Sequence, residues 1–570
     1  MKKIFILLLI LSLFTVSASA NEYLKEKEFK SKLIGNWIEV NGDTYFTFTH
    51  DEIFINGKAY GKYEIEGNQL KLSNGKSGDV SFEDRYLILA KSRYEKISEE
   101  ELNKLKKDIL LGTKLKLSKE KVNEDLDRLK KIVEDQFSYL KANNVDYIAA
   151  IDAIKQKNVS QGGMTINQLA LEIDKFIALF IDGHARIKTD YDRPNDDQFL
   201  PFLIESIKDK YIAFYENREN FVEKDYPYIV SINGVVIDDW IKVASRFYPK
   251  GSPQYQKRNG LRILRNIGFL QSQMNLNATD QIEVILQSKD GKTLKKHMKV
   301  ANEKPYYGDW PKDKVDDSRI VDNNMGYLRI EDMEDIEDEP EYIEKIKQKM
   351  SEFKNTKALV IDVRSNGGGT RDILYTVFPY FMSNRDKSVV INATVYKKSG
   401  KFDPDHLESR RLYRENSTHW TKEEKQAISD FKKNFVPQIK YNKGDFSDMH
   451  YGVISNRKTK DMYYYDKPVY ILIDEKCFSA TDVFVSAFKG MKNITLIGRP
   501  TGGGSARSRT VFLKNSRLKI KMGSMISFQK NGLLFDTNGI KPDIYVEVLP
   551  AYFLKNGKDN ILQKAIDVIQ

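Results

Sequence analysis

A serine at the start of a predicted helix is the residue of this 570-residue chain best placed for nucleophilic chemistry. Ser479 follows Val469–Ile473, a run of β-branched, aromatic and leucine residues typical of a buried strand. After it, apolar residues recur at the spacing of one helix face, and Ile494 to Ile497 forms another short apolar run. This order predicts a βαβ unit of a parallel sheet, with Ser479 at the positive end of its helix. A hydroxyl there could attack a carbonyl while free N–H groups stabilise the oxyanion.

The same stretch has a purely structural interpretation. Ser479-Ala-Thr-Asp482 has the form of a capping box, and a serine at a helix start is a cap far more often than a nucleophile. Catalysis therefore needs partners elsewhere in the chain.

A glycine-rich loop is the first candidate partner. Asn366-Gly-Gly-Gly369 follows the apolar run Ala358 to Val363 and precedes a predicted helix. A tight turn that needs glycine is one interpretation, and phosphate binding by free N–H groups is another. The G-K-[ST] ending of a phosphate-binding loop and the G-x-G-x-x-G dinucleotide pattern are both absent. If the two strands are neighbours, the amides of Gly368 and Ala480 would form an oxyanion hole.

Two other residues could take part in this chemistry. His184 comes directly after Asp182-Gly183, where a strongly amphipathic predicted helix ends with Gly183 as a C-cap glycine, and this fixes its position. A lone histidine is usually a packed or surface residue, so its position alone does not establish a role. Cys477 is the single cysteine and lies two residues before Ser479, where we expect a small buried turn residue rather than a nucleophile.

Composition narrows the possible classes of protein. The chain is 41% hydrophobic and 30% charged, with a formal charge of +11 and scattered basic residues. We find no zinc-ligand spacing, no aromatic RNA-binding motif and no basic helix, so we expect no nucleic acid partner, no metal and no cofactor. One cysteine allows no internal disulfide.

The first twenty residues have the three parts of a signal peptide. Lys2 and Lys3 precede an apolar run from Ile4 to Val16, and Ala18-Ser19-Ala20 is a small-residue cleavage site. Cleavage before Asn21 removes two lysines, so 11 − 2 leaves a charge of +9. No other stretch is long enough to span a bilayer. We therefore expect an exported protein, periplasmic or secreted, with no stable membrane insertion.

The length favours several domains. Residues 21–96 alternate short apolar runs with Asn-Gly turns and predict a small antiparallel β domain, whereas 97–190 are helical and carry His184. Residues 200–302 alternate strands with helices in an order similar to a PDZ domain. Residues 318–570 hold the parallel sheet, with a charged and partly helical insertion at about 383–466.

Four motifs together resemble one family. They occur in the order LFIDGHARI, ALVIDVRSNGGGT, ILIDEKCFSATDVFVSAF with TLIGRPTGGG, and DTNGIKPDIYV. This set is similar to the C-terminal processing (tail-specific) serine peptidases and covers most of residues 97 to 550. The resemblance implies an α/β multidomain protein with a ClpP/crotonase-like βαβ core, a helical region and a PDZ-like domain, preceded by the N-terminal antiparallel β domain.

One departure from the family pattern decides the expected mechanism. Members of the Ser–Lys type carry a lysine in a T-F-G-K context, but here Gly504 of Thr501-Gly-Gly-Gly504 stands at that place. The sequence is similar instead to the tricorn-like branch, which uses serine, histidine and an acid. That resemblance implies His184 as the base and Asp536, before Gly539-Ile-Lys-Pro-Asp543, as the acid. Asp536 also has a simpler interpretation as a turn residue.

The sequence thus predicts an exported serine peptidase that hydrolyses peptide bonds through Ser479, His184 and Asp536, by endoproteolysis or C-terminal processing. The main alternative is a catalytically inactive protein of the same fold that binds a peptide or a lipid-like ligand. A third is an envelope-binding module built around the N-terminal β domain. The oligomeric state, the natural substrate and the cleavage preference stay open.

Overall fold

The computed structural model divides into two compact units. One comprises residues 1–125, 158–166 and 511–519, and the other 126–157, 167–510 and 520–570. The structure describes residues 28–39, 45–55, 58–66, 69–73, 76–89, 92–103, 112–142, 144–308, 310–321, 324–399, 406–459 and 462–569. The predicted signal peptide and the four Asn/Gly turns of the β domain lie outside these residues. Among the described helices, none is long and apolar enough to cross a membrane.

The N-terminal β domain is a closed antiparallel barrel, in which β1 pairs with both β2 and β8. Its strands alternate inward and outward side chains, and Trp37, Phe48, Tyr63 and Leu87 fill the interior. The predicted antiparallel domain is confirmed as a barrel. Its strands are β1 (Gly35–Glu39), β2 (Tyr45–Phe48), β3 (Glu52–Ile55), β4 (Lys58–Glu66), β5 (Gln69–Leu72), β6 (Ser77–Glu83), β7 (Tyr86–Leu89) and β8 (Ser92–Ile97).

The helical region contains α3 (Lys119–Gln136), α4 (Tyr147–Ser160) and α5 (Ile166–Ile177). The sequence predicted that the last would continue to Asp182, with Gly183 as its C-cap. The structure corrects this, because α5 ends at Ile177 and the next residues form tighter turns, with Leu179 and Phe180 each donating to the carbonyl three residues earlier. Gly183 is not left-handed. It instead permits close packing, since a Cβ there would lie 2.6 Å from the Phe478 ring.

Residues 200–302 form a small α/β unit. The sheet order is β12-β13-β14-β16-β17, with β15 paired to β14 through a turn in which Asn233 and Gly234 both have positive φ. Strands and helices alternate here as the sequence predicted. The elements are β12 (Leu203–Ile207), β13 (Lys210–Phe214), β14 (Tyr228–Ile232), β15 (Val235–Val236), α6 (Ile237–Ala244), α7 (Pro253–Leu264), α8 (Ile267–Gln273), β16 (Gln281–Gln287) and β17 (Thr293–Lys299).

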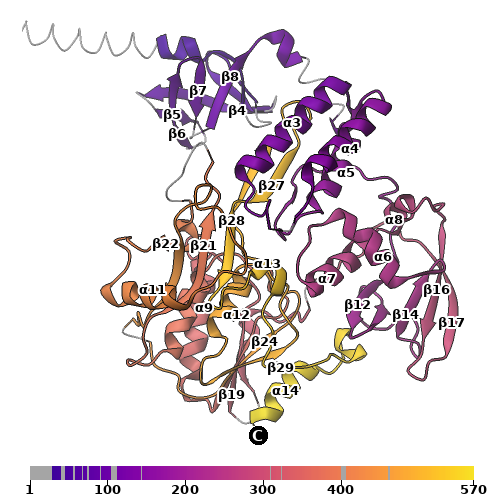
Figure 1. Ribbon diagram of the computed structural model, residues 1–570, viewed down its shortest axis with the longest axis vertical. Helices are drawn as coiled ribbons and strands as arrows, with labels where there is room; N and C mark the ends of the chain where they lie inside the picture. The colour runs from indigo at the N-terminus through magenta and orange to yellow at the C-terminus, as the bar shows by residue number, and fades with distance from the viewer. Residues whose placement is uncertain are drawn as a thin grey trace, which may run out of the picture. The chain divides into compact units, whose positions relative to one another are not determined.

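The predicted parallel sheet is present, with the order β18-β19-β20-β24-β25-β29 and an antiparallel edge at β18. Figure 1 labels three of its strands, β19, β24 and β29. Its strands are β18 (Arg319–Val321), β19 (Met325–Arg329), β20 (Ala358–Asp362), β24 (Val469–Ile473), β25 (Ile494–Gly498) and β29 (Ile544–Tyr545). Helix α12 (Ala480–Phe488) connects β24 to β25, which confirms the βαβ unit. Strands β20 and β24 pair in parallel, so the glycine loop and the Ser479 turn lie side by side at the carboxyl ends of these strands.

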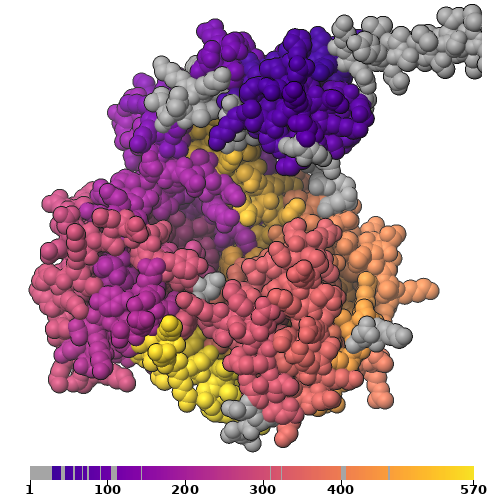
Figure 2. All heavy atoms as spheres, turned by 180° about the vertical axis from the view of Figure 1, so that it is seen from behind, coloured from indigo at the N-terminus to yellow at the C-terminus, as the bar shows by residue number. Residues whose placement is uncertain are grey.

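The two faces of this sheet bury different partners. Leu328, Ile361 and Ile471 share a core with α12, α9 (Pro340–Glu352) and α10 (Asp372–Val377). Tyr327 and Leu472 lie in a second core with residues of β12, β13 and the C-terminal helix α14 (Asn560–Ile569). In Figure 2 the C-terminal segment, in yellow, lies between the purple and the salmon parts of the chain. Every residue of the central strands β19, β20 and β24 is therefore buried, which explains their continuous apolar runs.

The charged segment at 383–466 is more than a partly helical insertion. It contributes three strands to a four-stranded sheet of order β22-β23-β21-β28, in which β21 pairs with β28. Ile391 and Ile454 bury their side chains in the α12 core, so the segment completes that core. The elements are β21 (Val389–Tyr396), β22 (Tyr413–Arg414), α11 (Lys422–Asn434), β23 (His450–Ile454) and β28 (Met525–Gln529).

The structure also describes shorter elements. They are β9 (Lys116–Leu117), β10 (Met164–Thr165), β11 (Arg186–Ile187), β26 (Ser508–Phe512), β27 (Lys519–Gly523), α13 (Phe535–Asn538) and seven 3₁₀ turns at Gly112–Lys114, Ser245–Phe247, Val315–Asp317, Phe353–Asn355, Phe378–Phe381, Glu408–Arg410 and Pro550–Phe553.

Candidate active site

The turn that carries Ser479 is strained. Ser479 has φ 61° and ψ −117°, a conformation that a non-glycine residue adopts only when its surroundings impose it. It begins α12, but its side chain makes no capping hydrogen bond. Asp482, the other half of the expected capping box, accepts instead from Thr501 Oγ1 at 2.5 Å and from the Gly503 N–H at 3.2 Å. The serine hydroxyl is thus presented to another part of the chain rather than used as a helix cap.

His184 is the residue that meets this hydroxyl. Its Nε2 lies 3.1 Å from Ser479 Oγ, although the two residues are 295 positions apart in the sequence. The imidazole also stacks on Phe478, with ring centroids 4.9 Å apart. Its backbone N–H donates to Asp182 Oδ1 at 3.0 Å, and β11, which follows directly, pairs with β27. These contacts hold the ring against the nucleophile turn.

The protonation state of His184 suits a general base. Burial, together with the positive charges of Lys521, Arg410 and Arg186, lowers the pKa of His184 to about 3. The imidazole is therefore neutral at pH 7 and can accept a proton on Nε2.

Asp536 lies behind the histidine, within a cluster of two carboxyl groups. One ligand atom of each of Asp182, His184 and Asp536 lies within 4.8 Å of those of the other two. The Tyr139 hydroxyl donates to Asp536 Oδ2 at 2.8 Å. Asp536 Oδ1 and His184 Nδ1 are both buried and have no hydrogen-bond partner. The third member predicted from the sequence is thus next to His184, but the hydrogen bond that would orient the ring is not formed.

Both carboxyl groups are harder to ionise than usual. Burial and the neighbouring Asp182 raise the pKa of Asp536 to about 7. Burial raises the pKa of Asp182 to about 6, although N–H groups of Gly523 and His184 favour its charged form. Both carboxyl groups therefore lose their protons closer to neutral pH than an ordinary aspartate does.

This cluster is the one group of three potential metal ligands among the described residues. Few of its atoms are available to bind a metal ion, because both Asp182 oxygens accept backbone N–H groups and Asp536 Oδ2 accepts from the Tyr139 hydroxyl. Asp536 Oδ1 and His184 Nδ1 are what remains, fewer ligands than a typical zinc site uses. The arrangement suits an acid that orients a histidine better than a metal centre.

The glycine loop packs directly on the nucleophile turn. A Cβ on Gly368, which has φ +95°, would lie 2.5 Å from the Phe478 carbonyl oxygen and 2.8 Å from the Ala480 nitrogen. Ala480 is at the first turn of α12, where N–H groups have no acceptor within the helix. The Gly368 N–H, however, donates to Asn366 Oδ1 at 2.9 Å. Ala480 is therefore the better-placed donor of the two expected from the sequence, and Gly368 must first leave Asn366.

We expect Gly368→Ala to lower kcat by about 100-fold or more, because the new methyl group must displace the Ser479 turn. Gly367→Ala is the matched control, since its Cβ meets no atom within 4 Å. Labelling with a fluorophosphonate probe and peptide hydrolysis measure the effect. Equal activities of the two variants would contradict the packing argument.

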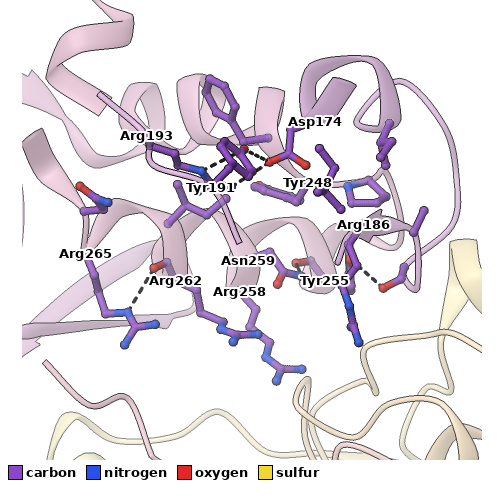
Figure 3. A pocket seen from close by; sticks show the side chains of 18 of the residues that line it. Asp174, Arg186, Tyr191, Arg193, Tyr248, Tyr255, Arg258, Asn259, Arg262 and Arg265 are labelled. Carbon is purple, nitrogen blue, oxygen red and sulfur yellow. Dashed lines mark hydrogen bonds and ion pairs between the residues drawn. The ribbon is translucent and has the colours of Figure 1, made fainter. Parts of the chain in front are cut away.

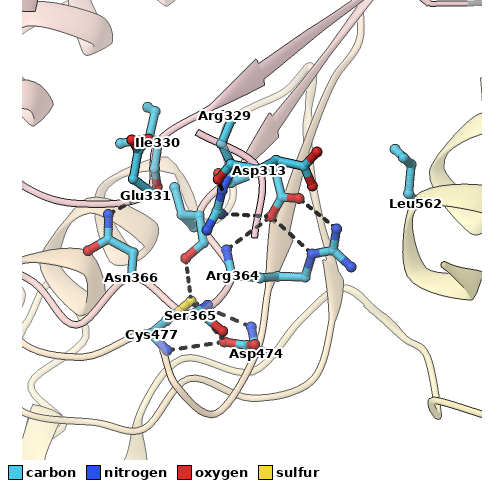
Figure 4. Close-up of polar contacts among 12 residues, drawn as sticks. Asp313, Arg329, Ile330, Glu331, Arg364, Ser365, Asn366, Asp474, Cys477 and Leu562 are labelled. Carbon is cyan, nitrogen blue, oxygen red and sulfur yellow. Dashed lines mark hydrogen bonds and ion pairs between the residues drawn. The ribbon is translucent and has the colours of Figure 1, made fainter. Parts of the chain in front are cut away.

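A buried polar network holds both loops (Figure 4). Asp474 Oδ1 accepts from the N–H groups of Ser365 and Cys477 at 2.9 and 3.2 Å, which ties the end of β20 to the nucleophile turn. Asp362 pairs with Arg364 and Arg329, and these cations hold the pKa of Asp362 below its usual value despite burial. The Cys477 thiol donates to the Val363 carbonyl, and burial raises its pKa well above the ordinary value. Cys477 is a buried turn residue, as predicted.

Several supporting residues were not singled out from the sequence. Asn366 accepts from Thr481 Oγ1 at 2.6 Å, and its carbonyl accepts from the Phe478 N–H, so it joins the glycine loop to α12. Asp182 lies inside the LFIDGHARI motif, so the sequence could have indicated it as a site residue. Tyr139 lies in no motif, so nothing in the sequence indicated its role.

Comparisons with known proteins identify the class. Residues 324–546 match the family model described as Peptidase family S41. The fold also resembles mature CPAF, with a TM-score of 0.55 and 16% identity over 78% of this chain and 96% of that chain. The structure of mature CPAF complexed with lactacystin has a TM-score of 0.53 and 16% identity, over 79% of this chain and 98% of that chain. The photosystem II D1 C-terminal processing protease has a TM-score of 0.36 and 12% identity, over 75% of this chain and 93% of that chain. At these identities the likeness to CPAF shows the fold alone.

The class defined by this match is that of the serine-type peptidases, which are hydrolases. The chain carries a peptidase family S41 domain, and this confirms the family resemblance seen in the sequence.

Proposed function

We propose that this chain hydrolyses peptide bonds of protein or peptide substrates with Ser479 as nucleophile, His184 as general base and Asp536 as the orienting acid. The observation that carries the proposal is the 3.1 Å contact between His184 Nε2 and the hydroxyl of a strained Ser479. A serine hydroxyl needs a base, and a neutral imidazole at this distance supplies one.

In the proposed reaction, Ser479 Oγ attacks the scissile carbonyl while its proton moves to His184 Nε2. The Ala480 N–H stabilises the oxyanion, joined by the Gly368 N–H once that group leaves Asn366. His184 then gives the proton to the leaving amine, and water cleaves the acyl-enzyme by the same steps in reverse. Asp536 Oδ1 accepts from His184 Nδ1 as the gap between these two unpartnered atoms closes, since such contacts often tighten only with substrate bound.

We further propose that residues 200–302 are a PDZ-like domain that takes a peptide along a sheet edge. The supporting observation is the order of β12 to β17 with α6 and α7. Its helix α7 lies near the nucleophile turn, where Ser252 Oγ donates to the Gly502 carbonyl at 2.5 Å. A peptide held by this domain would thus be near Ser479.

An inactive binding protein is the second candidate. Two observations favour it: His184 Nδ1 has no partner, and the Gly368 N–H is occupied by Asn366. Incubating the protein with casein separates the candidates. Fragments that appear with the parent protein and not with Ser479→Ala support the peptidase, and intact casein after long incubation would favour the binding protein.

Export is part of the proposal, and its motive is the Ala18-Ser19-Ala20 site after an apolar run. We expect the mature chain to begin at Asn21, in the periplasm or outside the cell. N-terminal sequencing and intact mass of the exported protein check this. A chain that still begins at Met1 would contradict the proposed cleavage.

A further inference from the structure

A cavity of about 670 Å³ lies beside the proposed site (Figure 3). Gly183, Gly367 and Phe478 form part of its wall, so it adjoins both His184 and the glycine loop. Its remaining wall is rich in basic side chains. A peptide that reaches Ser479 would have this cavity next to it.

Three arginines of the wall form a row along one helix. Arg258, Arg262 and Arg265 stand at i, i+4 and i+7 of α7 and its C-cap, which places them on one face. Figure 3 shows them side by side, with Arg186 beyond Arg258. We call these three residues the arginine row. Like charges at this spacing destabilise a helix, so folding alone does not favour the row.

The positive charge of the cavity wall is only partly compensated. The wall contains six cationic side chains and three carboxyl groups, so 6 − 3 leaves +3. One carboxyl group, Asp174, is already paired with Arg193. Among the residues that the structure describes, Arg258, Arg265 and Lys304 make no ion pair. Burial, then repulsion from Arg262, lowers the pKa of Arg265.

The row also leads to the nucleophile turn. Arg258 Nη1 donates to the carbonyls of Glu475 and Lys476, each at 3.4 Å, while its Nε is buried without a hydrogen-bond partner. Seven residues of helix span about 10 Å, the length of about three residues of an extended peptide. An anionic peptide segment lying along the row would therefore place its next residues close to Ser479.

We propose that the arginine row binds substrate carboxylates, so that the peptidase prefers peptides that carry acidic groups within a window of about three positions near the scissile bond. This proposal rests on the proposed function, because it takes the ligand to be a peptide substrate. The carboxylates come from Asp or Glu side chains or from the peptide C-terminus, and both present the planar oxygen pair that arginine recognises.

The test measures binding to Ser479→Ala protein, so that it does not depend on catalysis. The probes are fluorescein-labelled neutral peptides carrying one Glu, moved a position at a time, their Gln counterparts, and versions with a free or amidated C-terminus. We expect the best Glu peptide to bind about tenfold more tightly than its Gln counterpart. Loss of affinity on amidation alone would assign the carboxylate to the chain end.

Arg262→Gln is the test substitution because this side chain is the exposed member of the row. We expect it to reduce the Glu preference to about threefold or less. Lys257→Gln removes the same charge from the same helix, away from the cavity wall, and should keep the preference.

Three results would overturn the proposal: Glu and Gln peptides that bind equally or not at all, a preference that survives Arg262→Gln, or one that Lys257→Gln also removes. Parent protein that leaves casein intact while acidic peptides still bind would refute the peptidase mechanism and leave the carboxylate site standing.

Discussion

Ser479→Ala should reduce casein and peptide hydrolysis by ~10⁴-fold or more while the protein stays folded. The hydroxyl is the atom that faces His184 Nε2, and no other described nucleophile is placed there, since the Cys477 thiol is buried and donates to Val363. The sequence interpretation of Ser479 as a helix cap predicts a loss of about 1 kcal/mol for this variant. The structure removes that expectation, because the Ser479 side chain makes no capping bond.

Ser479→Gly provides the matched control for backbone strain. Glycine adopts positive φ readily, so this variant should be more stable than Ser479→Ala by on the order of 1 kcal/mol, after the entropy cost of glycine is subtracted. Both variants should fail to react with a fluorophosphonate probe. Cleavage of casein at the parent rate by folded Ser479→Ala protein would end the serine hypothesis.

The sequence could predict the parts of the site that lie close to Ser479 along the chain, but not the contacts with residues far from it. Strand β24, the turn and α12 follow from local periodicity, because each buries a continuous apolar face. His184 and Asp536 are far from Ser479 in the sequence, and only the family resemblance linked them to it. The contact between His184 and Ser479 could not be derived from spacing at all.

The errors have local physical causes. The apolar pattern continues through Ala178 and Phe180, so it predicts more helix than forms, but the backbone there closes tighter turns. Strand β21 was hidden in a segment with many charges, although Val389–Tyr396 is itself largely apolar. The hydrogen bond between Gly368 and Asn366 depends on loop geometry that composition does not specify.

Asp536→Asn should lower kcat by about 100-fold or more, and by up to ~10⁴-fold if the acid is as tightly coupled as in the best-studied triad. The amide oxygen can still accept from Tyr139, so the local contact survives. The new NH₂ group faces His184 Nδ1 and favours the tautomer that protonates Nε2, which cannot act as a base towards Ser479. The turn role of Asp536 predicts near-normal activity instead. A change of less than threefold would mean that another group orients His184.

The same substitution should increase stability at alkaline pH. The pKa of Asp536 is raised to about 7 in the folded state, above its value of about 4 in the unfolded chain. Its contribution to stability is therefore fully present below pH ~4 and is lost as the pH rises through about 7. At pH 8 the parent carries the whole cost of a buried charge, at most about 4 kcal/mol for three pKa units, and the amide carries none. Melting curves should show a higher Tm for Asp536→Asn at pH 8 and a smaller difference at pH 5.

Asp182→Asn separates the orienting role from the removal of charge. Both Asp182 oxygens accept backbone N–H groups, from His184 and from Gly523, so an amide must place its NH₂ group against one of these donors. We expect this variant to lose stability at both pH values and to lose activity through displacement of the His184 loop. Opposite stability changes with a shared loss of kcat would identify Asp536 as the orienting acid and Asp182 as the residue that positions the histidine. A Tm of Asp536→Asn no higher than that of the parent at pH 8 would contradict the buried charge on which this assignment rests.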